Sequence, residues 1–367
     1  MTARADDERF MALALVLGRR GLGNTWPNPA VGAVVVQGGN IAGRGWTQPG
    51  GRPHAETEAL RRAGPFAHAA TLYVTLEPCS HHGKTPPCAD AIIAAGIARV
   101  VSAIQDPNPE VAGQGHARLR AAGIAVDIGL KAKDAARDND GHIRRIRDHR
   151  PHVTLKLAVS ADGKVALPGR KPVAITSEQA NAHVHLMRAM HDAILIGIGT
   201  ALSDNPLLTC RLPGMEKRSP VRVVLDRDLR LPASSRLAIT ARETPLWILA
   251  AADAPRANEN ALRDAGAEII RVAADATGVD LASALRLLAD KGITRLLVES
   301  GPRVASSFLT ADLIDEAVLL RGPATIGPAG IDALDDLPLE ALTASARLTL
   351  AGQDKLGPDT IQFYERI

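Results

Sequence analysis

Three side chains that can bind a transition metal lie close to an acidic residue in the first quarter of the sequence. His54 is followed two residues later by Glu56, and Cys79 and Cys88 lie further along, with eight residues between them. One imidazole and two thiolates suit Zn²⁺ and would leave a fourth coordination position open for water. Zinc lowers the pKa of a bound water, and a carboxylate beside the metal can move the released proton. The spacing therefore predicts metal-assisted hydrolytic chemistry with Glu56 as the catalytic proton shuttle.

The same residues match the pattern H-x-E followed by P-C and a second cysteine. This pattern is typical of zinc deaminases that act on the amino group of a heterocycle. The alternative is a chance tripeptide together with cysteines that are buried apolar residues. A structural zinc site normally has four protein ligands, and His81 or His82 could supply the fourth. The conjunction of all three parts favours the catalytic zinc site. Cys210 lies in the other half of the chain, and we interpret it as unrelated to the metal.

Composition argues against several other classes of protein. A chain of 367 residues predicts two domains. The formal net charge of +3 and the aromatic content of 2% disfavour a nucleic-acid-binding or membrane-surface protein. No apolar run of about 18 residues is present, and the N-terminal sequence lacks the layout of a signal peptide. We therefore expect a cytoplasmic protein with no membrane partner. Three cysteines in a chain of this length do not indicate a disulfide framework.

The segments that must hold the metal ligands alternate between helical and extended patterns. In the first half we predict strands at 30–37, 71–76, 99–104 and 125–128, and helices at 7–20, 55–63, 89–95 and 111–122. Gly38-Gly39-Asn40 would close the first strand. Such alternation is typical of an α/β sandwich with a mostly parallel sheet. It places His54 and Glu56 at a helix start and Cys79 after a strand.

A basic segment that ends at a proline, 142–152, is the predicted linker, and the predicted domains are residues 1–148 and 149–367. A second α/β pattern follows, with a helix at 177–190 that Thr176 and Gln179 would cap. Its strands are predicted at 153–160, 193–198, 221–226, 245–250, 267–272, 293–299, 315–320, 346–351 and 360–365.

Two glycine-containing turns in the second half follow predicted strands. They are Gly-Ile-Gly-Thr, which ends at Thr200, and Glu-Ser-Gly-Pro, which starts at Glu299. No G-x-G-x-x-G motif follows a strand there, so a Rossmann site is not indicated. Backbone N–H groups at the helix start near Gly301 could still receive a pyrophosphate, because a helix N-terminus attracts anions.

The run from Glu77 to Cys88, EPCSHHGKTPPC, closely resembles the bifunctional riboflavin-biosynthesis deaminase/reductase family. Its long insertion between the two cysteines differs from the short P-C-x-x-C of ordinary cytidine and transfer-RNA deaminases. The resemblance extends over nearly the whole chain. It implies a cytidine-deaminase-like α/β/α domain followed by a dihydrofolate-reductase-like α/β domain. Other matching stretches are PNPAVG at 27–32, PHAE at 53–56, QDPNP at 105–109, LKL at 155–157, DG at 162–163 and DNPLLT at 204–209.

For the first domain, the resemblance implies zinc-dependent hydrolytic deamination of a diaminohydroxyphosphoribosylaminopyrimidine. The matching zinc ligands are His54, Cys79 and Cys88, and the matching proton shuttle is Glu56. Lys84 would meet the substrate phosphate as a flexible point charge. The competing interpretation of His81 and Lys84 is that they are solvent-facing side chains. The implied substrate contacts are Asn28, His81, Lys84, Asp106 and Asn108.

For the second domain, the resemblance implies NADPH-dependent reduction of 5-amino-6-(5-phosphoribosylamino)uracil, which converts the ribosyl chain to ribityl. The implied substrate contacts are Lys156, Arg188, Leu208, Arg211 and Glu299. The implied cofactor contacts are Ala158, Ala174, Thr200, Asp204, Asp226, Gly301, Pro302, Arg303, Val304, Ala305, Ser306 and Ser307. A mid-helix arginine such as Arg188 could instead be solvated, whereas Arg211 lies beside a loop.

Two other functions compete with this prediction. One is a single-activity nucleobase or nucleoside deaminase whose C-terminal domain binds a ligand without reducing it. The other is a zinc-stabilised binding module without catalysis. Glu56 disfavours the binding module, because a structural zinc has no use for a carboxylate next to the metal. We expect a small-molecule pyrimidine ribotide as substrate, no nucleic-acid partner, and a homo-oligomer.

Overall fold

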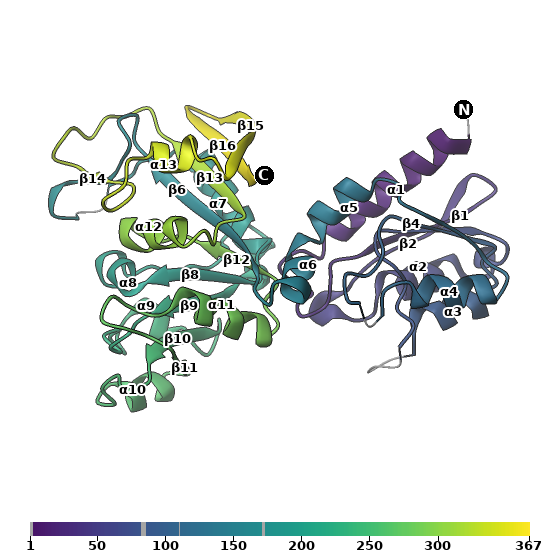
Figure 1. Cartoon of the computed structure of the whole chain (residues 1–367), viewed down its shortest axis with the longest axis horizontal. Helices are drawn as coiled ribbons and strands as arrows, with labels where there is room; N and C mark the ends of the chain where they lie inside the picture. Colours follow the sequence, from purple (N-terminus) through teal and green to yellow (C-terminus); the bar gives the residue numbers. More distant parts are fainter. Residues whose placement is uncertain (1–2, 82–85, 110, 171–172) are drawn as a thin grey trace. The chain divides into compact units, whose positions relative to one another are not determined.

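The computed structural model describes residues 3–81, 86–109, 111–170 and 173–367 (Figure 1). The chain divides into two compact units, Met1–Arg150 and Pro151–Ile367. The first unit ends two residues after the predicted boundary at 148. Among the described residues, no helix has both the length and the apolar character needed to cross a membrane.

The predicted linker is mostly helical, which corrects the sequence interpretation. Helix α6 (Asp140–Arg147) occupies much of the segment 142–152, and strand β6 (His152–Val159) already begins at its end. Ile143 and Ile146 lie three residues apart and so share one side of this helix. The basic residues between them dominated the composition and hid this periodicity.

The first unit is a five-stranded sheet between two helical layers (Figure 1). Its strands, in sheet order, are β2 (Asn40–Trp46), β1 (Gly32–Gln37), β3 (Thr71–Val74), β4 (Arg99–Ser102) and β5 (Ala125–Ile128). The helices are α1 (Ala3–Arg19), α2 (Ala55–Ala63), α3 (Cys88–Ala94), α4 (Gln114–Ala121), α5 (Ala132–Asp138) and α6. In β1, Ala33 and Val35 pack with α2, α3 and α4, whereas Val34 and Val36 pack with α1 and α5. This period of two places apolar side chains on both faces of the sheet.

The sheet of the first unit is mixed, so the expected mostly parallel sheet is wrong for this unit. Strand β1 pairs antiparallel with β2 and β3, and only the pairs β3–β4 and β4–β5 are parallel. Strand β2 is not among the predicted strands, because Gly38-Gly39-Asn40 is also compatible with a simple end of the first strand. The tripeptide is instead the turn of a hairpin, in which Gly38 and Gly39 have φ angles of 57° and 80°.

Two glycines of β2 allow helix α2 to lie directly on the sheet. A Cβ atom on Gly43 would lie 2.1 Å from the carbonyl oxygen of Ala59, and one on Gly45 would lie 2.1 Å from that of Ala55. Only glycine fits a strand where another backbone approaches so closely. This contact fixes the start of α2, and therefore the position of the residues around Glu56.

The second unit contains a nine-stranded sheet. In the sheet order given below, the first seven strands, from β11 across to β13, are parallel to their neighbours. The last two, β16 and β15, pair antiparallel, β16 with β13 and β15 with β16. The strands in sheet order are β11 (Glu268–Val272), β10 (Leu246–Ala251), β9 (Val221–Leu225), β8 (Ala193–Gly197), β12 (Arg295–Val298), β6, β13 (Glu316–Arg321), β16 (Asp359–Arg366) and β15 (Leu348–Leu356). Strands β7 (Lys164–Ala166) and β14 (Ile331–Asp332) form a separate pair.

The helices of the second unit are α7 (Glu178–Ala189), α8 (Ile198–Asp204), α9 (Arg236–Ile239), α10 (Glu259–Asp264), α11 (Leu281–Asp290), α12 (Pro302–Thr310) and α13 (Glu340–Thr343). Residues of α7 to α10 join the sheet in one apolar core, which includes Val184, Leu237 and Leu262. Because the central strands are parallel, their carboxyl ends meet at one edge, where open α/β sheets bind ligands.

Helix α7 begins at a different cap from the one predicted. Ser177, not Thr176, is the N-cap, and its Oγ accepts a hydrogen bond from the Ala180 N–H at 3.4 Å. The Ser177 hydroxyl also donates to the buried carboxylate of Asp359 at 2.6 Å. This contact with β16 selects Ser177 over its neighbour, and the local sequence does not reveal it.

Candidate functional site

The three predicted metal ligands come together at the starts of two helices. His54 is the N-cap of α2, Cys88 is the first residue of α3, and Cys79 follows β3. The Nδ1 atom of His54 lies 3.3 Å from the Cys88 sulfur and 3.7 Å from the Cys79 sulfur. All three ligand atoms lie within 4.8 Å of one another. The Cys88 N–H donates to the Cys79 sulfur at 3.2 Å. One nitrogen and two sulfur donors so arranged fit a zinc ion with an open coordination position.

Glu56 lies in the first turn of α2 and is only 4% exposed. Burial raises the pKa of its carboxyl group, and its side chain interacts with the thiol of Cys88. A hydrogen bond from the Cys88 thiol lowers the pKa of Cys79 and raises that of Cys88, so the two sulfur atoms share a proton that metal binding would release. A buried carboxyl group with a raised pKa beside a sulfur ligand suits a residue that takes up and returns a proton.

Four of the five predicted substrate contacts of the first unit lie among the described residues. Asn28 is half-buried, and a Cβ atom on Gly51 would lie 2.1 Å from its side-chain nitrogen. Asp106 and Asn108 lie in the loop after β4, where the Asp106 carboxylate accepts the Asn108 N–H at 2.8 Å. His81 is exposed and does not belong to the three-ligand group.

Two predicted residues of this region cannot be placed. Lys84 and His82 lie in the segment 82–85, outside the described residues.

The electrostatic environment of Asp106 connects the loop after β4 to the predicted metal site. Burial raises the pKa of Asp106, the Glu77 and Cys79 charges raise it further, and His81 acts in the opposite sense. Asp106 therefore lies near the residues on either side of the metal ligand Cys79.

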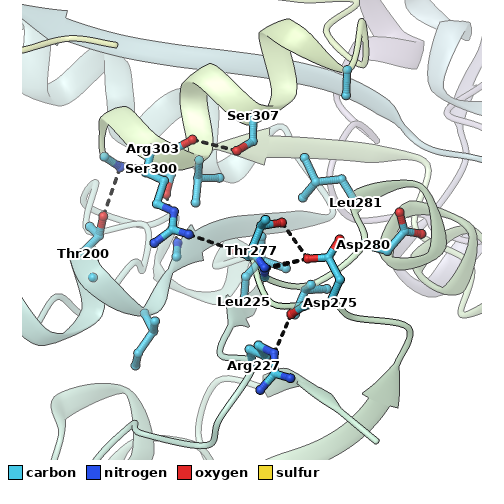
Figure 2. Close-up of a pocket in the computed structure, with 18 of the residues that line it drawn as sticks. Thr200, Leu225, Arg227, Asp275, Thr277, Asp280, Leu281, Ser300, Arg303 and Ser307 are labelled. Carbon is cyan, nitrogen blue, oxygen red and sulfur yellow. Dashed lines mark hydrogen bonds between the residues drawn. The ribbon is translucent and has the colours of Figure 1, made fainter. Parts of the chain in front are cut away.

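A cavity of about 830 Å³ lies at the carboxyl ends of β8, β9 and β12 (Figure 2). The starts of α8 and α12 line it, and the Gly301 N–H donates to the Thr200 hydroxyl at 3.0 Å across them. The predicted helix start after Gly301 is confirmed, with Pro302 as the first helical residue. The predicted cofactor contacts that line this cavity are Thr200, Gly301, Pro302, Arg303, Val304 and Ser307.

The other six predicted cofactor contacts are not among the residues lining this cavity. They are Ala158, Ala174, Asp204, Asp226, Ala305 and Ser306. Asp226 is fully buried and accepts the Leu231 N–H at 2.8 Å, so it supports the turn after β9. Ala305 is a core residue, and the Ser306 hydroxyl donates to the Asp335 carbonyl oxygen at 2.9 Å. Asp204 and Ala174 are exposed.

The sequence did not reveal that the segment 275–282 also lines the cavity; it consists of the loop before α11 and the first two residues of that helix. Figure 2 shows Arg303 and Arg227 reaching this loop from α12 and from the end of β9. Arg303 donates to the Thr277 carbonyl oxygen at 2.7 Å, and Arg227 donates to that of Asp275 at 2.6 Å. A polar loop with a glycine after strand β11 was the available signal, but its approach to α12 depends on the tertiary fold.

A buried cluster of charges joins three of the predicted substrate contacts of the second unit. The Arg188 guanidinium makes two hydrogen bonds to Glu299, of 2.8 and 3.0 Å, and the Lys156 ammonium lies 3.7 Å from the same carboxylate. These side chains are 13%, 8% and 15% exposed in the order Arg188, Glu299, Lys156. The alternative interpretation of Arg188 as a solvated arginine is therefore wrong.

The protonation of this cluster follows from burial and charge. Burial alone would raise the pKa of Glu299, but the charges of Arg188 and Lys156 outweigh it and hold the pKa at about 2. Burial lowers the pKa of Lys156 despite the nearby carboxylate. The cluster thus holds an ionised acid and an amine whose proton is easier to remove than usual.

The loop before Arg211 packs beside the same cluster. Arg188 donates to the Thr209 carbonyl oxygen at 3.2 Å, and the Arg211 N–H lies 3.3 Å from Nδ1 of His185. The Arg211 side chain is exposed and can reach a ligand. Leu208 is instead 4% exposed, with a φ angle of 58°, and belongs to the apolar core. Its side chain therefore supports the loop.

Comparisons with known proteins cover both units. Residues 4–104 match the cytidine and deoxycytidylate deaminase zinc-binding region, and residues 151–362 match the RibD C-terminal domain. The riboflavin biosynthesis protein RibD of Aquifex aeolicus is 39% identical over 363 residues, which cover 99% of each chain.

Two solved structures are similar over the full length of both chains. Acinetobacter baumannii RibD has a TM-score of 0.88 at 34% identity. A diaminohydroxyphosphoribosylaminopyrimidine deaminase/5-amino-6-(5-phosphoribosylamino)uracil reductase from Thermotoga maritima has a TM-score of 0.87 at 33% identity. Each covers 100% of this chain. The predicted family and the predicted pair of folds are confirmed. With its metal-binding deaminase unit and its reductase unit, the chain belongs to the RibD family of riboflavin biosynthesis proteins.

Proposed function

We propose that the protein catalyses two consecutive reactions of riboflavin biosynthesis. Residues 1–148 deaminate diaminohydroxyphosphoribosylaminopyrimidine, and residues 149–367 reduce 5-amino-6-(5-phosphoribosylamino)uracil with NADPH. The observation that carries this proposal is the convergence of His54, Cys79 and Cys88 beside the buried Glu56. A relative that is similar over its whole length carries both activities in its name.

In the deaminase unit, zinc bound by His54, Cys79 and Cys88 would supply a water of lowered pKa. Glu56 would accept a proton from the attacking water, whose oxygen bonds to the ring carbon that carries the amine. It would then return the proton to the amine, so that the C–N bond breaks and ammonia leaves. Burial raises the pKa of Glu56, which favours the protonated form that must return a proton to the amine. The proposed contacts that orient the pyrimidine ribotide are Asn28, His81, Lys84, Asp106 and Asn108.

In the reductase unit, NADPH would supply a hydride, and the cavity of about 830 Å³ beside α8 and α12 lies within the size range of small-molecule and cofactor sites. The N–H groups at the start of α12 would bind the pyrophosphate. Lys156, Arg188 and Glu299 would hold the ribose that is reduced, and Arg211 would bind the substrate phosphate. Hydride transfer depends on this positioning more than on a strong acid. The remaining proposed cofactor contacts are Ala158, Ala174, Thr200, Asp204, Gly301, Pro302, Arg303, Val304 and Ser307. Leu208, Asp226, Ala305 and Ser306 are buried and would support the site from behind.

Incubation of the protein with the diaminopyrimidine ribotide, with and without NADPH, tests both activities. We expect the deaminated ribotide without NADPH and the ribityl product with it, separated by mass. Removing zinc with a chelator should stop the first reaction, while NADPH oxidation with deaminated ribotide continues. If neither NADPH nor NADH is oxidised, the single-activity deaminase becomes the better proposal. Reductase activity without any deamination would instead reject the catalytic zinc site.

Arg211→Lys should raise the KM of the reductase for its ribotide and leave the KM for NADPH almost unchanged. A guanidinium can bind a phosphate through two parallel hydrogen bonds, which an ammonium cannot copy. A hydrogen bond to a charged group is worth about 1.5–3 kcal/mol, so kcat/KM should fall roughly ten- to a hundredfold. Arg286→Lys, at an exposed position of α11, is the matched control. If Arg211→Lys and Arg286→Lys have the same KM for the ribotide, Arg211 does not bind the substrate phosphate.

We also propose that the protein is a cytoplasmic homo-oligomer that binds neither nucleic acid nor membranes, as expected from its sequence. Light scattering of the purified full chain measures the number of copies in the particle.

A further inference from the structure

Glu77 is a buried carboxylate two residues before the metal ligand Cys79, and its side chain is 2% exposed. Glu77 is not among the site residues predicted from the sequence. Its two oxygen atoms accept four backbone hydrogen bonds, from Asp106 at 3.0 Å, Gly113 at 2.9 Å, Gly115 at 2.9 Å and His116 at 3.2 Å. A carboxylate has about four acceptor sites, so these bonds use its whole capacity.

The four donors lie at both ends of one loop and at the start of the helix that follows it. Asp106 lies near the beginning of the loop between β4 and α4, and Gly113 is the N-cap of α4. Gly115 and His116 belong to the first turn of α4, where N–H groups have no partner within the helix. The negative charge of the Glu77 carboxylate also lies at the positive end of the α4 dipole, which is a favourable position for it. One buried side chain therefore closes the loop and caps the helix.

The same side chain connects this loop to the segment that carries Cys79. A Cβ atom on Gly115 would lie 2.0 Å from the carbonyl oxygen of Pro78, so the start of α4 lies directly against this segment. The loop held by Glu77 carries Asp106 and Asn108, and the Asp106 carboxylate in turn orders the Asn108 backbone. Glu77 thus links one metal ligand to two of the proposed substrate contacts.

We propose that Glu77 is a positioning residue of the deaminase, which fixes Asp106 and Asn108 relative to Cys79 and so orients the pyrimidine substrate. The proposal rests on the proposed deaminase function of the first unit. Glu77 itself does not reach the substrate, because the backbone of the loop occupies both of its oxygen atoms. A displaced loop would weaken the hydrogen bonds of Asp106 and Asn108 to the pyrimidine, so the main effect should fall on substrate affinity.

Glu77→Gln tests this role, because glutamine keeps the shape but turns an NH₂ group toward two N–H donors. We expect the KM for the diaminopyrimidine ribotide to rise tenfold or more, with a smaller change in kcat, since Glu56 and the zinc ligands are not held by Glu77. The zinc content should stay at the wild-type value. The reductase activity of the same molecules should also stay unchanged. Glu77→Asp keeps the charge on a shorter side chain and should shift KM in the same direction.

Asp7→Asn is the matched control in the same unit. The Asp7 carboxylate also accepts several hydrogen bonds, from Tyr73 and Arg99, but it does not touch the loop. Asp7→Asn should lower Tm and leave the KM for the diaminopyrimidine ribotide unchanged. If the Glu77 variants lower Tm with an unchanged KM, or lose zinc, the positioning role is wrong. Should Glu77→Gln fail to fold, Glu77→Asp decides the question. Absence of deamination by the wild-type protein would reject the proposed function itself, independently of Glu77.

Discussion

Glu56→Gln is expected to reduce deamination by about 10²–10⁴-fold while the protein keeps its zinc and its reductase activity. The amide has nearly the same shape as the carboxylate but cannot accept and return a proton. Zinc should remain bound, because the three ligands around the metal position are His54, Cys79 and Cys88. Ammonia release measures the first reaction, metal analysis gives the zinc content, and NADPH absorbance follows the second reaction.

Glu58→Gln is the matched control in the same helix. Glu58 is 8% exposed and pairs with the more exposed Arg61 and Arg62, at 3.1 and 3.3 Å. This variant removes both ion pairs and should lower Tm, but Glu58 does not belong to the three-ligand group, so deamination should continue at nearly the wild-type rate. Loss of zinc in Glu56→Gln would mean that Glu56 holds the metal. Deamination that persists in this variant would mean that another group moves the proton.

Arg188→Met should destabilise the second unit by about 3–5 kcal/mol, because it leaves the Glu299 carboxylate buried with only part of its charge compensation. Lys156 would remain near this carboxylate, but at 3.7 Å and without the paired hydrogen bonds of the guanidinium. Reduction should be lost as well, since the cluster lies among the proposed substrate contacts. Thermal or denaturant unfolding measures the stability. Arg286→Met, on the surface of α11, should stay within about 0.5 kcal/mol of the wild type.

The pH dependence of stability gives an independent measurement of the same cluster. The folded-state pKa of Glu299, about 2, lies below the value of about 4.3 for an unperturbed glutamate. Its contribution to stability is therefore fully present above about pH 4.3 and is lost as the pH falls toward about 2. Glu299→Gln should remove this part of the acid sensitivity.

If Arg188→Met unfolds at the same temperature as the control Arg286→Met, the buried ion cluster does not stabilise the second unit.

Local patterns in the sequence were sufficient to place the metal ligands and several element boundaries. The predicted helix 55–63 coincides with α2, and the predicted strand at 125–128 coincides with β5. The break at Gly301-Pro302 likewise marks the start of α12. These features depend on the preferences of a few consecutive residues for helix starts, helix ends and burial on one side. The zinc motif was recognisable for the same reason, because His54 and Cys88 lie at the starts of helices, and Cys79 lies in the segment between β3 and α3.

Other features were decided only by the tertiary structure. The pairing of Arg188 with Glu299 spans 111 positions, and the hydrogen bond from His116 to Glu77 spans 39. In both cases a buried charge requires partners, but the sequence does not reveal which distant residue supplies them. The glycines of β2 also weakened the strand signal, although the close approach of α2 requires them. Element boundaries follow from neighbours in the chain, whereas the satisfaction of buried charges and the close contacts of backbones depend on neighbours in space.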